Sequence, residues 1–263
     1  LKLVREHDVD VLVGSSGDVY VAHVGWLLRK PSVLFDDTEH AKLQKKLSFP
    51  FASTIVVPKV YKRSFSSSVK HKVVRYNGYK ELAYLAPSVF KVKKQVLGKL
   101  PNILLRLVSW EASHDRGHGG VAELDELIGF LSSKGTLHIS SEKPLPRHLQ
   151  EYELQVPVER FHHALANMDL VVSEGGTVAA ESAVLGVPTV YVNDLRMGYT
   201  SDLAKRRLLV QTTDHTIILE KAKEFLSMST KRKFIQRKEK MLKDMVDVNA
   251  AMKKVILSCK KRK

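Results

Sequence analysis

Residues 169–188 read Asp169-Leu-Val-Val-Ser173-Glu-Gly-Gly-Thr177-Val-Ala-Ala-Glu181-Ser-Ala-Val-Leu-Gly186-Val-Pro188. The apolar run Asp169–Ser173 predicts a buried strand, and the glycine pair after it predicts a tight turn. Thr177–Leu185 predicts a helix that Gly186 ends, and Thr189–Val192 predicts the next strand. A strand, a helix and a second strand in this order are typical of a parallel sheet in an α/β protein.

The glycine turn of this segment is also its best candidate for ligand binding. Gly175 and Gly176 let the backbone approach a ligand closely, and the following helix N-terminus offers unpaired N–H groups to a phosphate. Glu181 lies one turn into that helix, among small and apolar residues, where a carboxylate needs a partner. A ribose diol would be such a partner, and the alternative is a structural ion pair with a nearby lysine or arginine.

The same alternation of strands and helices extends in both directions along the chain. We expect a first, partial α/β domain in residues 1–92, a second α/β domain in residues 93–229, and a basic helical tail in residues 230–263. The first half opens on the remnant of a helix, so an N-terminal βα portion is expected to be missing. The tail could cross back onto the first domain or stay solvated.

Further elements of the predicted fold follow from periodicity and turn residues. In the first half, strands are expected at Val9–Val13, Ser32–Phe35 and Lys72–Tyr76, and a helix at Asp18–Leu28. In the second half, strands are expected at Asn102–Val108 and Thr136–Ser140, helices at Gly120–Leu131 and Val158–Ala166, and more helices from Thr216 onward.

Composition limits the class of protein. The chain has 263 residues with 44% hydrophobic, 27% charged and 7% aromatic side chains, which excludes a peptide, a disordered chain and a collagen-like repeat. Its apolar runs are shorter than the ~20 residues that span a bilayer, and its first residues are no signal peptide. The single cysteine, Cys259, cannot form an intramolecular disulfide or a cysteine-based zinc site. We therefore expect a globular cytoplasmic protein.

The positive charge of the chain is concentrated in two segments. The formal net charge is +15, and residues 59–100 and 230–263 each contain ten more Lys and Arg than Asp and Glu. Such segments indicate an anionic partner, such as a phosphorylated substrate, an acidic membrane surface that the protein would meet peripherally, or nucleic acid. The alternative is a solvated lysine-rich surface. Nucleic acid is disfavoured, because the basic tail has one aromatic residue, Phe234, and base stacking needs several.

The loop after the predicted strand Asn102–Val108 is a second candidate site. It contains His114, Arg116 and His118 among three glycines. Loops at the carboxyl ends of strands bind ligands in α/β sheets, and these side chains offer acid–base groups and an anion clamp. The spacing of the two histidines would suit a metal on a helix, but the glycines disfavour a helix, so no metal is expected.

A third candidate is the acidic segment that follows strand Ser32–Phe35. Asp36, Asp37 and Glu39 can raise one another's proton affinity, which makes them candidate general acids or bases. The alternative is an acidic helix cap. Asp194 and Arg196 follow strand Thr189–Val192 in a loop beside the glycine turn, and they are candidate substrate contacts.

Four motifs together resemble one protein family. They are Phe35–Ala41 (FDDTEHA), Tyr76–Tyr84 (YNGYKELAY), Trp110–His118 (WEASHDRGH) and Glu174–Glu181 (EGGTVAAE). The combination resembles the DUF354 family of archaeal and bacterial proteins. That family is similar to glycosyltransferases of the GT-B fold and to UDP-N-acetylglucosamine 2-epimerase, which have two Rossmann-like domains and a nucleotide-sugar cleft between them.

The resemblance implies roles for individual residues. The residues that it assigns to the diphosphate of a nucleotide sugar are Ser173, Gly175, Gly176 and Thr177. Glu181 would bind the ribose hydroxyls. His114 and Arg116 stand where the epimerase has a His-Arg pair, and Glu39 lies near its acidic motif.

The function that follows from the resemblance is a glycosyltransferase reaction. A UDP-linked sugar would be the donor substrate, an unidentified molecule the acceptor, and neither metal nor cofactor would be needed. Asp37, Glu39 or His114 would serve as the general base. Two alternatives stay open: an epimerase-like reaction on the nucleotide sugar, and a non-catalytic module that binds nucleic acid or another anionic ligand.

Overall fold

The protein forms two compact units in the computed structural model, which describes all residues except 16, 110–120, 122 and 261–263. Unit 1 comprises Leu1–Ala83, Met197–Tyr199 and Asp244–Lys263, and unit 2 comprises Tyr84–Arg196 and Thr200–Lys243. The last helix, α12 (Val248–Lys260), therefore belongs to the unit in which the chain begins.

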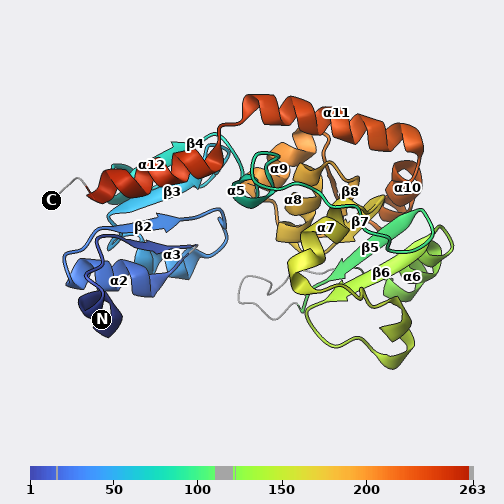
Figure 1. Cartoon of the computed structure of the whole chain (residues 1–263), viewed down its shortest axis with the longest axis horizontal. Coiled ribbons are helices and arrows are strands. Elements are labelled where there is room, and N and C mark those ends of the chain that lie inside the picture. The colour runs from blue at the N-terminus through green and yellow to red at the C-terminus, as the bar shows by residue number, and fades with distance from the viewer. Residues whose placement is uncertain (16, 110–120, 122, 261–263) are drawn as a thin grey trace. The chain divides into compact units, whose positions relative to one another are not determined.

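The described part of unit 1 contains a four-stranded parallel sheet (Figure 1). The strands lie side by side in chain order: β1 (Leu12–Gly14), β2 (Ser32–Phe35), β3 (Thr54–Pro58) and β4 (Val73–Tyr76). β2 and β3 are buried along almost their whole length, which explains why both read as continuous apolar runs.

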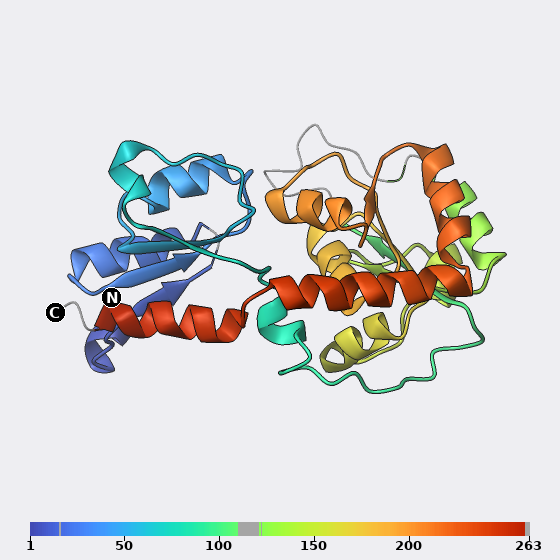
Figure 2. The ribbon, with the colours of Figure 1, turned by 90° about the horizontal axis from the view of Figure 1, so that it is seen from above.

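Helices pack on both faces of this sheet. Asp18 caps α2 (Val19–Leu27) by accepting a hydrogen bond from the Val21 N–H at 3.0 Å, and α2 packs against α3 (Lys42–Ser48). Ile55 belongs to the core on that side. Thr54 points to the opposite face, where its hydroxyl lies 3.5 Å from the Cys259 sulfur of α12. The ribbon of α12, next to the C-terminus, runs along this face of the unit 1 sheet (Figure 2). The remaining helices are short: α1 (Lys2–Glu6), α4 (Ser67–Lys70) and α5 (Leu82–Leu85), which crosses into unit 2.

The five-stranded parallel sheet described in unit 2 has a different strand order, β6-β5-β7-β8-β9. The strands are β5 (Asn102–Leu107), β6 (Thr136–Ser141), β7 (Leu170–Ser173), β8 (Thr189–Tyr191) and β9 (Val210–Gln211). The chain first adds β6 on one side of β5 and then returns to add β7 on the other side. This reversal creates a switch point between β5 and β7, and open α/β sheets bind ligands beyond the carboxyl ends of the strands at such a point.

The helices of unit 2 form a layer on each face of its sheet. α7 (Phe161–Ala166) contacts α8 (Gly176–Leu185), and α6 (Leu124–Ser132) contacts α10 (His215–Phe225). Because crossovers between parallel strands are right-handed, α6 lies on the face opposite to α7 and α8. The other helical segments are α9 (Gly198–Lys205), α11 (Met228–Asp244) and two 3-10 turns, Arg147–Tyr152 and Val158–Arg160.

The predicted α/β class with two parallel sheets is confirmed. Strand Ser32–Phe35 has the predicted bounds, and Gly186 ends α8 in the left-handed conformation, with a φ of 82°. The predicted strand Val9–Val13 was misplaced, because the backbone turns at Asp8, with a φ of 42°, and β1 begins later. The predicted helix Gly120–Leu131 starts later as well, at α6, where Asp125 and Glu126 stabilise the first turn.

The expected domain bounds after residues 92 and 229 stay a prediction. Unit 1 includes the chain up to Ala83, and unit 2 begins at Tyr84. The basic tail, residues 230–263, contributes to both units. Among the described residues, no helix combines the length and the apolar character that a transmembrane segment requires.

Candidate functional site

The turn between β7 and α8 stands at the carboxyl edge of the unit 2 sheet, beside the switch point. The Ser173 hydroxyl closes the turn by donating to the Gly175 carbonyl at 2.9 Å and accepting from the Gly175 N–H at 3.2 Å. A side chain at Gly175 would meet Val108 at 3.2 Å, so the neighbouring loop packs tightly against the turn. Glycine therefore suits this position because of a close approach between two segments.

The N-terminus of α8 opens to solvent at this turn. Gly175 is the N-cap residue and provides no side-chain cap, so the first N–H groups of the helix lack the acceptor that a serine or aspartate would supply. Gly175 and Gly176 are partly exposed and Thr177 is exposed. The arrangement offers backbone donors and the positive end of a helix dipole to an anion.

Glu174 is a buried carboxylate in the same turn. It is the first residue of the EGGTVAAE motif, and we predicted no role for it from the sequence. Its two oxygens accept hydrogen bonds of 2.9 Å from the N–H groups of Val108 and Val121. Val108 and Val121 lie on either side of residues 110–120, and Glu174 holds these two flanking residues at the edge of the glycine turn. The sequence could not reveal this role, because both donors are distant along the chain.

Glu181 is buried inside unit 2, with 8% of its side chain exposed. Its Oε1 accepts a hydrogen bond from the Tyr84 hydroxyl at 2.9 Å and lies 3.0 Å from Nε2 of His162. The rings of Tyr84 and His162 are 5.5 Å apart, so three polar side chains from α5, α7 and α8 form one cluster. Neither of these two partners is a lysine or an arginine, so they differ from the ion pair expected as the alternative. Sequence reasoning missed Tyr84 and His162 as site residues.

Asp194 and Arg196 lie in the loop after β8, and both are exposed. The preceding residue, Asn193, donates from Nδ2 to the Glu174 carbonyl at 3.0 Å and accepts from the Leu195 N–H at 2.8 Å. This bridge holds the β8 loop against the glycine turn. Asp194 and Arg196 therefore lie in a loop beside that turn, as the sequence predicted.

The acidic segment of unit 1 has internal partners. Asp36 is fully buried, 3.0 Å from Nζ of Lys45, and it accepts a 2.6 Å hydrogen bond from the Tyr61 hydroxyl. Burial lowers the pKa of Lys45, although Asp36 opposes this effect. Burial and the neighbouring Asp36 raise the pKa of Tyr61. The three side chains therefore form a buried ionic network.

The two proposed bases next to this network are also engaged. Asp37 pairs with Nζ of Lys80 at 2.8 Å. The two oxygens of Glu39 accept hydrogen bonds of 2.7 Å from the N–H groups of Lys62 and Gly198. Each oxygen keeps a second lone pair, so a substrate hydroxyl that approached Glu39 would share the carboxylate with these backbone donors.

His114, Arg116 and His118 lie outside the described residues. Their roles therefore stay predictions, and so does the expectation that this loop holds no metal. The structure describes the flanking residues Val108 and Val121, which are held by Glu174.

Part of the basic tail serves the fold of unit 2. Arg237 donates to the Arg207 carbonyl at 2.8 Å, and Lys238 donates to the Leu185 carbonyl at the end of α8 at 3.1 Å. Burial lowers the pKa of Lys238. These two cations satisfy backbone carbonyls at the end of α8 and just after α9. Part of the charge of the tail is therefore neither a solvated surface nor a ligand-binding surface.

A cavity of about 850 Å³ in unit 1 lies away from all these residues. Its lining includes Pro31, Ser53 and Lys72, which precede strands β2, β3 and β4. It therefore stands at the amino edge of its sheet, whereas the turns described above stand at carboxyl edges. Volume alone does not mark the candidate site.

Comparison with a curated relative finds one uncharacterised protein of Methanocaldococcus jannaschii, MJ0665, which is 27% identical over 214 residues. The match covers 74% of this chain and 61% of that protein, so the chain spans less than two thirds of the length of this relative.

Solved structures with a similar fold include two enzyme types. A candidate UDP-N-acetylglucosamine 2-epimerase from Listeria monocytogenes has a TM-score of 0.63 at 14% identity, covering 90% of this chain and 70% of that one. Spinosyn rhamnosyltransferase SpnG has a TM-score of 0.58 at 14% identity, covering 97% and 75%. The UDP-GlcNAc 2-epimerase of M. jannaschii, solved with UDP-GlcNAc and UDP, has a TM-score of 0.50 at 13% identity, covering 86% and 71%. The fold shared with these proteins is GT-B-like.

A family model described as "Protein of unknown function (DUF354)" matches residues 2–254, nearly the whole chain. The motifs of the acidic segment, the 110–120 loop and the glycine turn all fall within the match. The protein is a member of the DUF354 family.

Proposed function

We propose that this protein binds a nucleotide-diphosphate sugar at the β7–α8 turn of unit 2 and transfers the sugar to an acceptor. The observation that carries the proposal is the uncapped, solvent-accessible glycine turn at the start of α8, with the buried carboxylate of Glu181 one turn farther along. The position of this turn beside the β5–β7 switch point supports the proposal, because such crevices bind nucleotides in open α/β sheets.

The diphosphate would meet the first N–H groups of α8, at Gly176 and Thr177. A helix N-terminus carries about half a positive charge, and its N–H groups point toward a bound anion. When the bond between sugar and diphosphate breaks, negative charge grows on the leaving nucleotide. Fixed donors at this position would stabilise that charge without a metal ion.

Glu181 would bind the ribose. It follows Thr177 by one turn, which corresponds to about 6 Å along the helix axis. Tyr84 and His162 both contact Oε1, and they would hold the carboxylate so that Oε2 accepts a hydrogen bond from a ribose hydroxyl. A buried carboxylate with such fixed neighbours gives a directional contact rather than a mobile charge.

The sugar and the acceptor would be handled by the surrounding loops. Glu174 anchors the flanks of segment 110–120, which supports a substrate role for the His114, Arg116 and His118 side chains of that segment. Arg196 and Asp194 are exposed in the neighbouring loop and would add contacts.

A general base would take the proton of the acceptor hydroxyl. Its candidates are Asp37, Glu39 and His114. The occupied oxygens of Glu39 favour an orienting role for that residue.

A second candidate reaction is epimerisation of the nucleotide sugar, because two of the similar structures above are UDP-N-acetylglucosamine 2-epimerases or candidates for that activity. The binding site would be the same, and the fate of the sugar would differ. Incubation with UDP-N-acetylglucosamine without an acceptor separates the two reactions: epimerisation yields a new UDP-sugar, whereas a transferase leaves the donor unchanged apart from slow hydrolysis.

Calorimetric titration with UDP and with UDP-sugars tests the binding site itself. We expect saturable binding that Glu181→Gln weakens by about tenfold, the equivalent of ~1.4 kcal/mol. Glu220→Gln is the matched control, because Glu220 is exposed on α10, and it should leave the affinity unchanged. Equal affinities of wild type and Glu181→Gln would contradict the role of Glu181, and the absence of binding to any UDP, GDP, CDP or ADP ligand would contradict the proposed site.

A further inference from the structure

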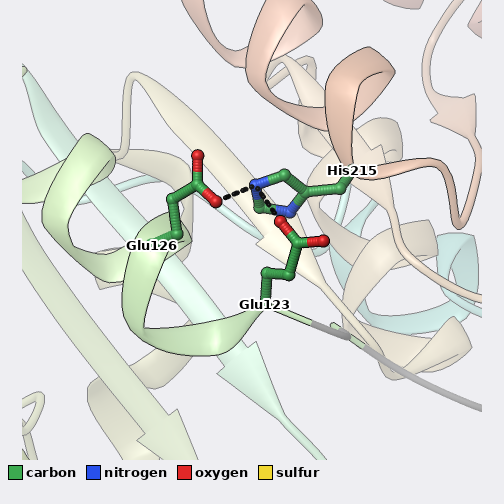
Figure 3. A group of neighbouring side chains, drawn as sticks. All are labelled: Glu123, Glu126 and His215. Carbon is green, nitrogen blue, oxygen red and sulfur yellow. Dashed lines mark ion pairs between the residues drawn. The ribbon is translucent and has the colours of Figure 1, made fainter.

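A second group of polar side chains lies at the carboxyl edge of the unit 2 sheet, between two helix N-termini. Glu123 precedes α6, Glu126 is in its first turn, and His215 begins α10 (Figure 3). One ligand atom from each residue lies within 4.8 Å of the other two. The group is independent of the nucleotide site, because α6 lies on the opposite face of the sheet from α8.

The distances within this group fit a bound metal ion. Nε2 of His215 is 3.3 Å from Oε2 of Glu123 and 3.4 Å from Oε2 of Glu126. Zinc binds histidine nitrogen and carboxylate oxygen at about 2.0–2.2 Å, and tetrahedral geometry then separates neighbouring ligand atoms by about 3.4 Å. Figure 3 shows the three side chains close together, with both carboxylates turned toward Nε2 of His215 at ion-pair distance.

The contacts of His215 also point to a ligand. Both ring nitrogens are buried and make no hydrogen bond to a described residue, although Nε2 lies at ion-pair distance from the two carboxylates. The side chain is 16% exposed, whereas Glu123 and Glu126 are 56% and 61% exposed. A buried nitrogen without a hydrogen bond is costly, and coordination to a cation would satisfy it.

The charges of the group are complementary to a divalent cation. Two carboxylates this close repel each other, and a dication with a neutral imidazole gives a site of zero net charge. One imidazole and two carboxylates suit a borderline ion such as Zn²⁺ better than Ca²⁺ or Mg²⁺, which prefer oxygen ligands alone. The alternative is a protonated His215 that bridges the two glutamates without metal.

We propose that Glu123, Glu126 and His215 form a three-residue Zn²⁺ site that joins the N-termini of α6 and α10. The exposed carboxylates leave the fourth coordination position open to solvent. This site could not be predicted from local sequence patterns, because β6, β7, β8 and β9 separate His215 from the two glutamates along the chain.

The test is titration of the chelator-treated full chain with Zn²⁺, followed by calorimetry, and with Co²⁺, followed by visible absorption. We expect one equivalent to bind and Co²⁺ to give the intense bands of a tetrahedral site. His215→Gln and Glu126→Gln should each weaken Zn²⁺ binding at least tenfold. Zn²⁺ should also raise the melting temperature of the wild type and not that of His215→Gln.

Two controls separate this site from others on the chain. Asp125→Asn removes a similar exposed charge from the same turn of α6 and should leave Zn²⁺ affinity unchanged. The double variant His114→Gln/His118→Gln should also bind one equivalent. Unchanged affinity in His215→Gln, or loss of binding in the double variant alone, would overturn the proposal, as would the absence of saturable binding to the wild type. If His215→Gln fails to fold by circular dichroism, Glu123→Gln decides by the same criteria.

Discussion

The two strand–helix junctions that follow β2 and β7 carry polar residues at the carboxyl edges of their sheets, yet they satisfy those residues differently. After β2, the carboxylates of Asp36, Asp37 and Glu39 each have partners within unit 1. After β7, the buried carboxylate of Glu174 anchors a loop, and the helix N-terminus is left without a side-chain cap. The charged residues after β2 thus form a structural network, whereas the junction after β7, which has fewer charged groups, presents backbone N–H groups without a side-chain cap.

Asp36 of the β2 junction is buried in a structural network, so we expect its replacement to cause the largest loss of stability. Asp36→Ala leaves the buried ammonium of Lys45 without its carboxylate, which should cost about 3–5 kcal/mol of unfolding free energy. Chemical denaturation measures this loss.

A matched double variant isolates the ionic contribution. Asp36→Ala/Lys45→Met removes both charges and should recover most of the stability, since apolar replacements of buried ion pairs are often neutral. A loss below about 1 kcal/mol in the single variant would mean that the β2 junction is not held by this network.

A smaller effect is expected at the β7 junction. Glu174→Ala removes the acceptor of two backbone N–H groups and should cost about 2 kcal/mol of unfolding free energy. Glu142→Ala is the control, because Glu142 also accepts from a loop N–H, at Ser109, but is 44% exposed. Glu142→Ala should lower the unfolding free energy by less than about 1 kcal/mol. Equal losses in the two variants would show that burial of Glu174 adds nothing.

The smallest effect concerns acid stability of unit 2. Burial lowers the pKa of His138 below its ordinary value near 6.5, so the unfolded chain takes up this proton first as the pH falls. The stability contribution is therefore complete above about pH 6.5 and declines below it. His138→Gln should flatten the pH dependence of the unfolding free energy in that window, whereas His148→Gln, at an exposed residue, should not. An unchanged slope in His138→Gln would contradict this origin.

The β7 junction could be predicted from sequence because its signals are local. Strand, glycine turn, helix and Gly186 stop follow one another within a short segment, and each has its own pattern. The partners of Glu181 could not be predicted, since Tyr84 is 97 residues away and comes from a different helix. β9 was missed because two residues, Val210–Gln211, carry no periodicity.

The acidic segment shows a different limit. Its residue types fit either catalysis or capping, and sequence alone left both open. The choice depends on Lys45, Tyr61 and Lys80, whose distances to the acids only the fold defines. Similarly, α3 (Lys42–Ser48) was not predicted because its apolar residues Leu43 and Leu47 are exposed and its lysines obscure the helical period.

The N-terminus of α8 is the proposed binding site for the diphosphate of a nucleotide sugar. Thr177→Glu tests it most directly, because an acidic residue in the first turn stabilises a helix by about 0.3–1 kcal/mol but repels a phosphate at the same position. Thr177→Gln is the matched neutral control. Calorimetry with UDP should show binding to wild type and Thr177→Gln and at least tenfold weaker binding to Thr177→Glu, with no loss of melting temperature. Equal UDP affinity in all three proteins would contradict the claim.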